Sequence, residues 1–94
     1  MKSKELFKLK AALLSAMAND RRLMILDLLT EREASVGDIS DHIGLSQSAI
    51  SQHLRLFRVN KMVKTRRSAQ NIFYSEPSDG VLKVLDLLSE IFDE

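Results

Sequence analysis

The stretch "SVGDISDHIGLSQSAISQHLRLFR", residues 35–58, decides the fold of this 94-residue chain. Its first part has apolar residues at helical spacing, which predict a short helix over residues 36–43: Val36, Ile39 and Ile43. Ser35 with Asp38 has the form of a capping box at the start of that helix. Gly44 is expected to end it, because glycine readily adopts the positive φ of a helix C-terminus. Ser46 can then cap a second helix.

The second helix of this stretch is predicted to bury one face and expose the other. Ile50, Leu54 and Phe57 are spaced i, i+4, i+7, which indicates a buried stripe. Uncharged polar and basic residues fall on the other side or beside it: Gln47, Ser48, Ser51, Gln52, Arg55 and Arg58. A short helix, a glycine turn and a capped helix together predict a helix-turn-helix over residues 36–58.

The exposed face of the second helix has the chemistry of a DNA-reading surface. A glutamine can form two hydrogen bonds with adenine, and a serine can form a hydrogen bond with any of several bases. Arginines meet phosphates or guanine. The face carries no acid that the DNA backbone would repel. We therefore predict that the six polar and basic residues just named contact double-stranded DNA.

A basic β-hairpin is predicted to follow the second helix directly. Residues 62–67 and 71–75 favour extended structure, and Ser68-Ala69-Gln70 is expected to join them as a loop of about three residues. Four side chains of this hairpin are predicted to contact DNA: Lys64, Arg66, Arg67 and Gln70. Phe73 and Tyr74 are expected to pack at its base. A hairpin behind a helix-turn-helix is the wing of a winged helix, here residues 62–76.

The distribution of charge supports the same interpretation. The net charge is only +1, but residues 42–75 hold six basic residues and no acid. Residues 76–94 hold one base and six acids. A basic segment of this kind suits an anionic polymer such as DNA.

The remaining segments are expected to be helices at the two ends of one domain, residues 1–94. We predict a helix over residues 3–17, a second capped by Asn19 and ending near Glu31, a tiny strand at Ala34-Ser35, and a last helix capped by Ser78. The fold class is thus mainly α, in the order α-α-α-α-β-β-α. The terminal helices, 1–17 and 78–94, carry more apolar residues than a small domain can bury, which predicts a homodimer. The expected interface comprises Leu6, Phe7, Leu9, Leu13, Leu82, Leu85, Leu88, Ile91 and Phe92.

Other classes of function lack the residues that they need. Without cysteine, thiolate metal sites and disulfides are excluded. His42 and His53 are eleven residues apart and match no common ligand spacing, so we expect no metal and no cofactor. No nucleophile–base pair or glycine-rich phosphate loop is visible, so we expect no enzyme. The chain shows neither a signal peptide nor a membrane span, and we expect it to be cytoplasmic.

Three stretches resemble the ArsR/SmtB family of bacterial winged-helix repressors, and within it the metal-independent NolR/HlyU-like branch. They are "LLSAMANDRRLMILDLL", the stretch quoted first, and "VKTRRSAQNIFYS". The resemblance covers roughly residues 13–92. It implies a homodimer built from the terminal helices, a recognition helix over residues 47–58, and repression at a palindromic operator. The cysteines by which many members sense metals are missing.

Two alternatives remain open at this point. A winged helix can bind proteins instead of DNA, so its basic face could bind an acidic partner. The chain could also be a metal-responsive regulator whose atypical site uses His42 and His53.

Overall fold

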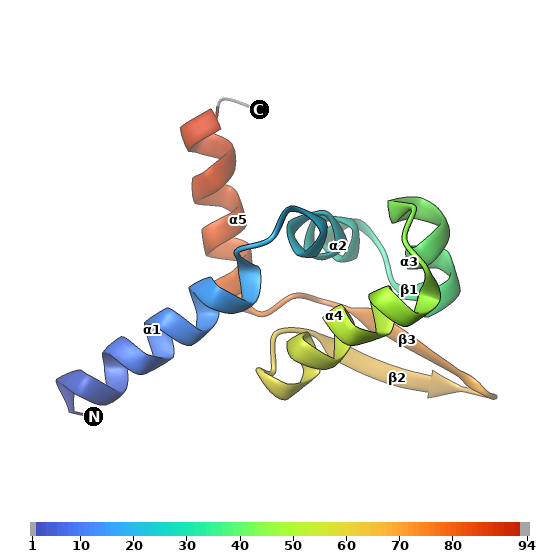
Figure 1. The fold of residues 1–94 in the computed structure, drawn as a ribbon, viewed down its shortest axis with the longest axis horizontal. Coiled ribbons are helices and arrows are strands. Elements are labelled where there is room, and N and C mark those ends of the chain that lie inside the picture. Colours follow the sequence, from blue (N-terminus) through green and yellow to red (C-terminus); the bar gives the residue numbers. More distant parts are fainter. Residues whose placement is uncertain (1, 93–94) are drawn as a thin grey trace.

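The computed structural model describes residues 2–92 of the chain. Within them the elements follow the predicted order, including the tiny strand (Figure 1): α1 Ser3–Met17, α2 Asp20–Glu31, β1 Ala34–Ser35, α3 Val36–Ile43, α4 Gln47–Val59, β2 Lys64–Ser68, β3 Asn71–Ser75 and α5 Asp79–Phe92. The mainly helical winged-helix fold predicted from the sequence is therefore confirmed.

Local capping contacts begin and end the helices where the sequence predicts them. Asn19 accepts a hydrogen bond from the Arg22 amide at 3.0 Å and so starts α2. Both bonds of the predicted capping box of α3, between Ser35 and Asp38, are present at 3.2 Å. Gly44 ends α3 with a φ of 82°. These contacts fix the turn that sets α4 across α3.

The hydrophobic core lies beneath α4. Its largest fully buried side chains come from four of the helices and from the loop before β2: Ile25, Leu26, Ile39, Ile50, Leu54, Phe57, Met62 and Val81. The three from α4 form the stripe that the sequence predicted. Because this stripe is fully buried, the opposite face of α4 is held toward solvent.

The sheet has the strand order β1-β3-β2 and is antiparallel throughout. The prediction that the first wing strand begins at Met62 was wrong, since that side chain is only 2% exposed and belongs to the core. Strand β2 begins at Lys64 instead. The predicted three-residue loop is also shorter, because Ser68 pairs with Asn71 and leaves only Ala69 and Gln70 in the turn. Ala69 turns the chain with a φ of 56°.

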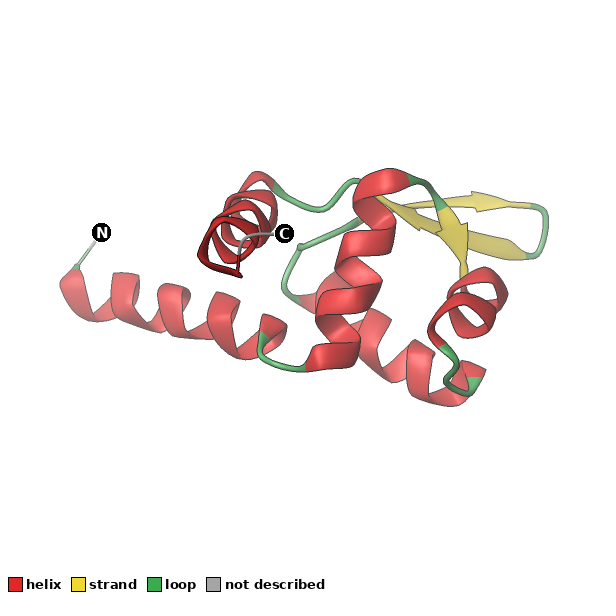
Figure 2. Ribbon diagram, turned by 90° about the horizontal axis from the view of Figure 1, so that it is seen from above, coloured by secondary structure: helices red, strands yellow, loops and turns green. Residues whose placement is uncertain are grey.

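Helices α1 and α5 lie away from the wing. Figure 2 shows the hairpin at one end of the molecule and α1 at the other. Arg22 fixes the corner between α1 and α2, because its Nε donates to the Ala16 carbonyl at 2.8 Å. Residues 3–12 of α1 are all exposed within a single chain. Among residues 2–92 there is no helix with the length and apolarity that crossing a membrane requires.

Candidate nucleic-acid interface

The outer face of α4 presents all six of the side chains predicted to contact DNA. Each of them is exposed: Gln47, Ser48, Ser51, Gln52, Arg55 and Arg58. No hydrogen bond or ion pair within the described part of the chain engages their side chains. They are therefore free to meet another molecule.

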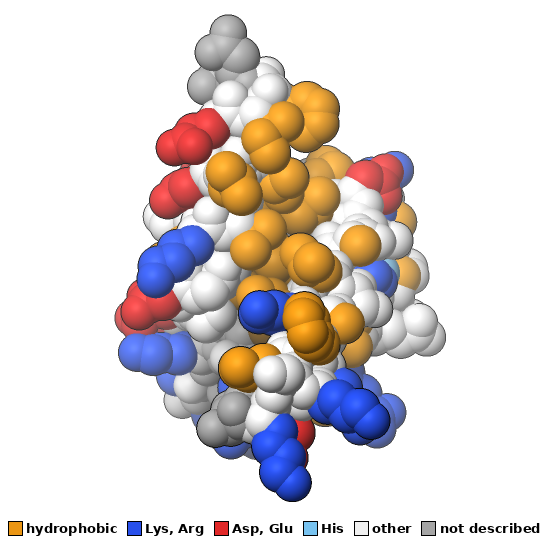
Figure 3. Space-filling model, turned by 90° about the vertical axis from the view of Figure 1, so that its left-hand side faces the viewer, with side chains coloured by type: hydrophobic (Ala, Val, Ile, Leu, Met, Phe, Trp, Pro, Cys, Tyr) orange, Lys and Arg blue, Asp and Glu red, His pale blue; other side chains and the backbone are white. Residues whose placement is uncertain are grey.

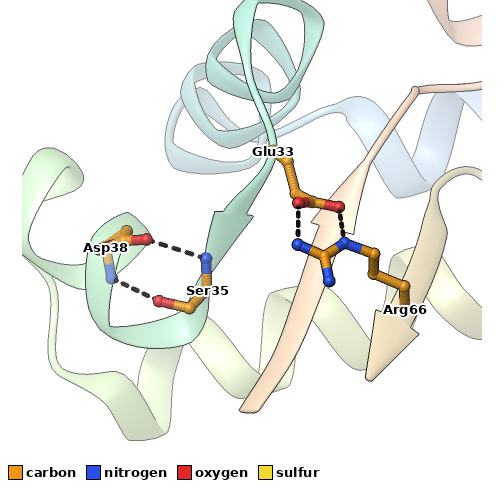
Figure 4. A network of polar contacts seen from close by, with 4 residues as sticks. All are labelled: Glu33, Ser35, Asp38 and Arg66. Carbon is orange, nitrogen blue, oxygen red and sulfur yellow. Dashed lines mark hydrogen bonds and ion pairs between the residues drawn. The ribbon is translucent and has the colours of Figure 1, made fainter. Parts of the chain in front are cut away.

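The wing carries the other predicted DNA contacts, and two of them are already paired within the chain. Lys64 Nζ lies 2.8 Å from Glu76 Oε2. Arg66 makes a bidentate contact, with its Nε and Nη2 each 2.7 Å from one oxygen of Glu33 (Figure 4). Arg67 and Gln70 are exposed, and Arg67 has no ion-pair partner among residues 2–92. The sequence prediction missed both carboxylate partners.

The ion pairs shift the pKa values of Glu33 and Lys64. The hydrogen bond from Arg66 lowers the pKa of Glu33, so the carboxylate stays charged further into the acid range. The hydrogen bond to Glu76 raises the pKa of Lys64. Each pair places a carboxylate beside a cation of the wing and so reduces the positive potential there.

The two histidines lie on different helices. His42 is exposed near the end of α3, and His53 is half-buried on α4. Burial, together with the nearby positive charge of Arg22, lowers the pKa of His53. Within the described residues no three His, Cys, Asp or Glu side chains are grouped so as to hold a metal ion.

A large apolar surface covers the side of the molecule that α1 and α5 form. Figure 3 faces this side and shows hydrophobic side chains gathered in a band over it. Among the nine predicted interface residues, Leu13, Leu82, Leu85 and Leu88 are half-buried, while Leu6, Phe7, Leu9, Ile91 and Phe92 are exposed. An open hollow of about 300 Å³ lies between α2 and α5, beside Met24, Leu88 and Phe92.

Comparison with known proteins identifies the family. Residues 19–58 match the family described as bacterial regulatory protein, arsR family. The nodulation protein NolR of Rhizobium meliloti is 52% identical over 93% of this chain and 71% of its own length. The chain belongs to the arsR family. The transcriptional activator HlyU of Vibrio cholerae is 48% identical over 85% of this chain and 74% of its own length. The resemblance to NolR and HlyU is thereby confirmed.

Solved structures of similar proteins agree with the fold. The crystal structure of NolR from Sinorhizobium fredii superposes with a TM-score of 0.91, at 49% identity over 98% of this chain and 94% of that one. A homodimeric winged helix-turn-helix DNA-binding domain from Mycobacterium bovis gives 0.86, at 29% identity over 99% of this chain and 86% of that one. This arsR-family chain is thus a DNA-binding transcriptional regulator and not an enzyme.

Proposed function

We propose that this chain is a cytoplasmic repressor that binds a palindromic operator as a homodimer and responds to no metal. The observation that carries the proposal is the acid-free outer face of α4, which the buried stripe opposite holds toward solvent. In this arrangement Gln47, Ser48, Ser51 and Gln52 read bases in the major groove, and Arg55 and Arg58 contact phosphates.

The wing contributes to the same surface. Arg67 and Gln70 are the members of the predicted set that have no partner within the described chain, so they are the wing side chains that we assign to DNA. The partners of Lys64 and Arg66 compete with phosphate for those two cations.

The proposed dimer uses the apolar surface of α1 and α5. Phe7, Ile91 and Phe92 are 66%, 61% and 73% exposed, and a large exposed apolar surface of this kind marks an interaction site. An isolated helix as short as α1 is marginal in water, so its exposed residues 3–12 need a partner. A second copy supplies one by two-fold symmetry, and such a dimer places two α4 helices on one duplex.

Selection of bound sites from a random duplex pool tests the proposal most directly. A recovered palindrome with half-sites about 10 bp apart, or a small multiple of that, supports a dimer with two recognition helices. Recovery of a single unrepeated half-site would contradict the two-fold geometry.

Matched substitutions then test the assignment of residues on the selected duplex. Gln52→Ala should cost about 1–3 kcal/mol of binding free energy and relax base preference at one position. Arg55→Gln should lower the slope of log affinity against log salt by about 0.9. Lys83→Gln removes the same charge from α5 and should leave the slope unchanged.

In vitro transcription from a promoter that carries the selected site tests the sign of regulation. A dimer bound at both half-sites of the promoter blocks the access of polymerase, so we expect less transcript as protein is added. More transcript would show activation and would contradict the proposed repression. Equal results with zinc and with a chelator are expected for a regulator that does not sense this metal.

A further inference from the structure

Two neighbours hold the guanidinium of Arg66, the carboxylate of Glu33 and the ring of Phe73. Its two nitrogens reach both oxygens of Glu33, and its centre lies 4.7 Å from the centroid of the Phe73 ring. Exposed ion pairs contribute little unless their geometry is well defined. The geometry of this ion pair is well defined, because the contact is bidentate and the guanidinium also lies over an aromatic ring.

The register of the sheet explains this arrangement. Phe73 pairs directly with Ser35 on one side and with Arg66 on the other, so these three side chains share one face. Glu33 precedes Ser35 by two residues and extends along the same face. Arg66 therefore reaches from β2 across β3 to the residue that precedes β1.

The same segment begins the helix-turn-helix. Ser35 caps α3 through its reciprocal bonds with Asp38, two residues after Glu33 (Figure 4). The Glu33–Arg66 pair thus joins the wing to the start of α3, and through α3 to the orientation of α4. Lys64, by contrast, pairs with Glu76 at the base of the hairpin, one residue beyond β3.

We propose that Arg66 is a positioning residue, which through Glu33 fixes the angle of the wing to the recognition helix, and that Arg67 is the wing cation for phosphate. Arg67 lies on the opposite face of β2, as alternation along a strand requires. The proposal rests on the DNA binding proposed above. The alternative, that Arg66 itself contacts phosphates, leads to opposite results in the following experiments.

The first experiment compares Arg66→Gln with Arg67→Gln, which remove equal charge from adjacent residues. Affinity is measured against salt for the selected duplex and for a random duplex. Arg67→Gln should lower the salt slope by about 0.9 on both duplexes. Arg66→Gln should leave the slope unchanged and weaken binding to the selected duplex about three- to tenfold. An equal loss of slope in both variants would overturn the proposal.

The second experiment separates the charge of residue 66 from its geometry. Arg66→Lys keeps the charge but cannot make the bidentate contact, so it should weaken selective binding as much as Arg66→Gln does. Glu33→Gln should also weaken binding to the selected duplex. The double variant Glu33→Gln/Arg66→Gln should bind that duplex no more weakly than either single variant does. Tighter binding by Glu33→Gln, or full activity of Arg66→Lys, would show that Arg66 contacts DNA.

A third measurement needs no DNA and so separates the two proposals. Backbone ¹⁵N order parameters of the free protein report the mobility of the wing. Glu33→Gln and Arg66→Gln should lower them for residues 66–72 from values near 0.85, and Arg67→Gln should not. Unchanged order parameters in both variants would overturn the positioning role even if the wild-type protein bound no duplex.

Discussion

At the residue scale, Gly44 shows how a single backbone conformation determines the turn of the helix-turn-helix. Its φ of 82° is strained for any residue with a Cβ, although an added Cβ would have no atom within 4 Å. The cost of Gly44→Ala is therefore conformational and not steric. We expect it to lower the free energy of unfolding by about 1 kcal/mol. Urea unfolding at constant m-value measures the loss, and an unchanged midpoint would contradict it.

His53 is the residue whose titration should affect stability near neutral pH. Its pKa is lowered in the folded chain by burial and by Arg22, so the unfolded chain binds the proton more readily. The stability that the neutral form contributes is present above the ordinary value of 6.5 and is lost as the pH falls through the lowered pKa. Thermal melts from pH 7 to pH 5 should show this loss, and His53→Gln should reduce it. His42→Gln is the matched control.

At the element scale, the turn of the wing carries an avoidable strain. Ala69 is the first residue of a two-residue hairpin turn and has a φ of 56°, a conformation that glycine adopts far more easily. Ala69→Gly should raise the free energy of unfolding by roughly 0.5–1 kcal/mol, the strain less the extra entropy of glycine in the unfolded chain. Chemical denaturation checks this. Gln70→Gly, at the neighbouring turn position, should not stabilise the protein.

At the scale of the whole molecule, the apolar surface of α1 and α5 should determine the oligomeric state. Phe7→Glu places a charge in the proposed interface, so we expect a monomer by sedimentation equilibrium, together with a lower melting temperature. Val59→Glu is the matched control. Val59 is 71% exposed but lies at the end of α4, so that variant should remain a dimer. A monomeric wild-type protein would contradict the interface.

Much of the fold was predictable because its signals act over short distances. The caps at Asn19, Ser35 and Ser46 each bond an amide three residues away, so residue type and spacing were enough to find them. The buried stripe of α4 was visible for the same reason, since it repeats with the helical period. The candidate DNA-reading face is the complement of that stripe.

Contacts between distant segments depended instead on register and packing. Glu33 and Arg66 are 33 residues apart, and they meet only because Phe73 lies between their strands in the antiparallel register. Met62 has the composition of a strand residue but fills the core below α4. Local propensity predicts neither the Glu33–Arg66 contact nor the burial of Met62, because both depend on tertiary packing. The chain's own residue pattern thus defined which helix exposes the candidate DNA-reading side chains, because helical periodicity is local. Three-dimensional packing defined which wing cations are left without an ion-pair partner in the described chain.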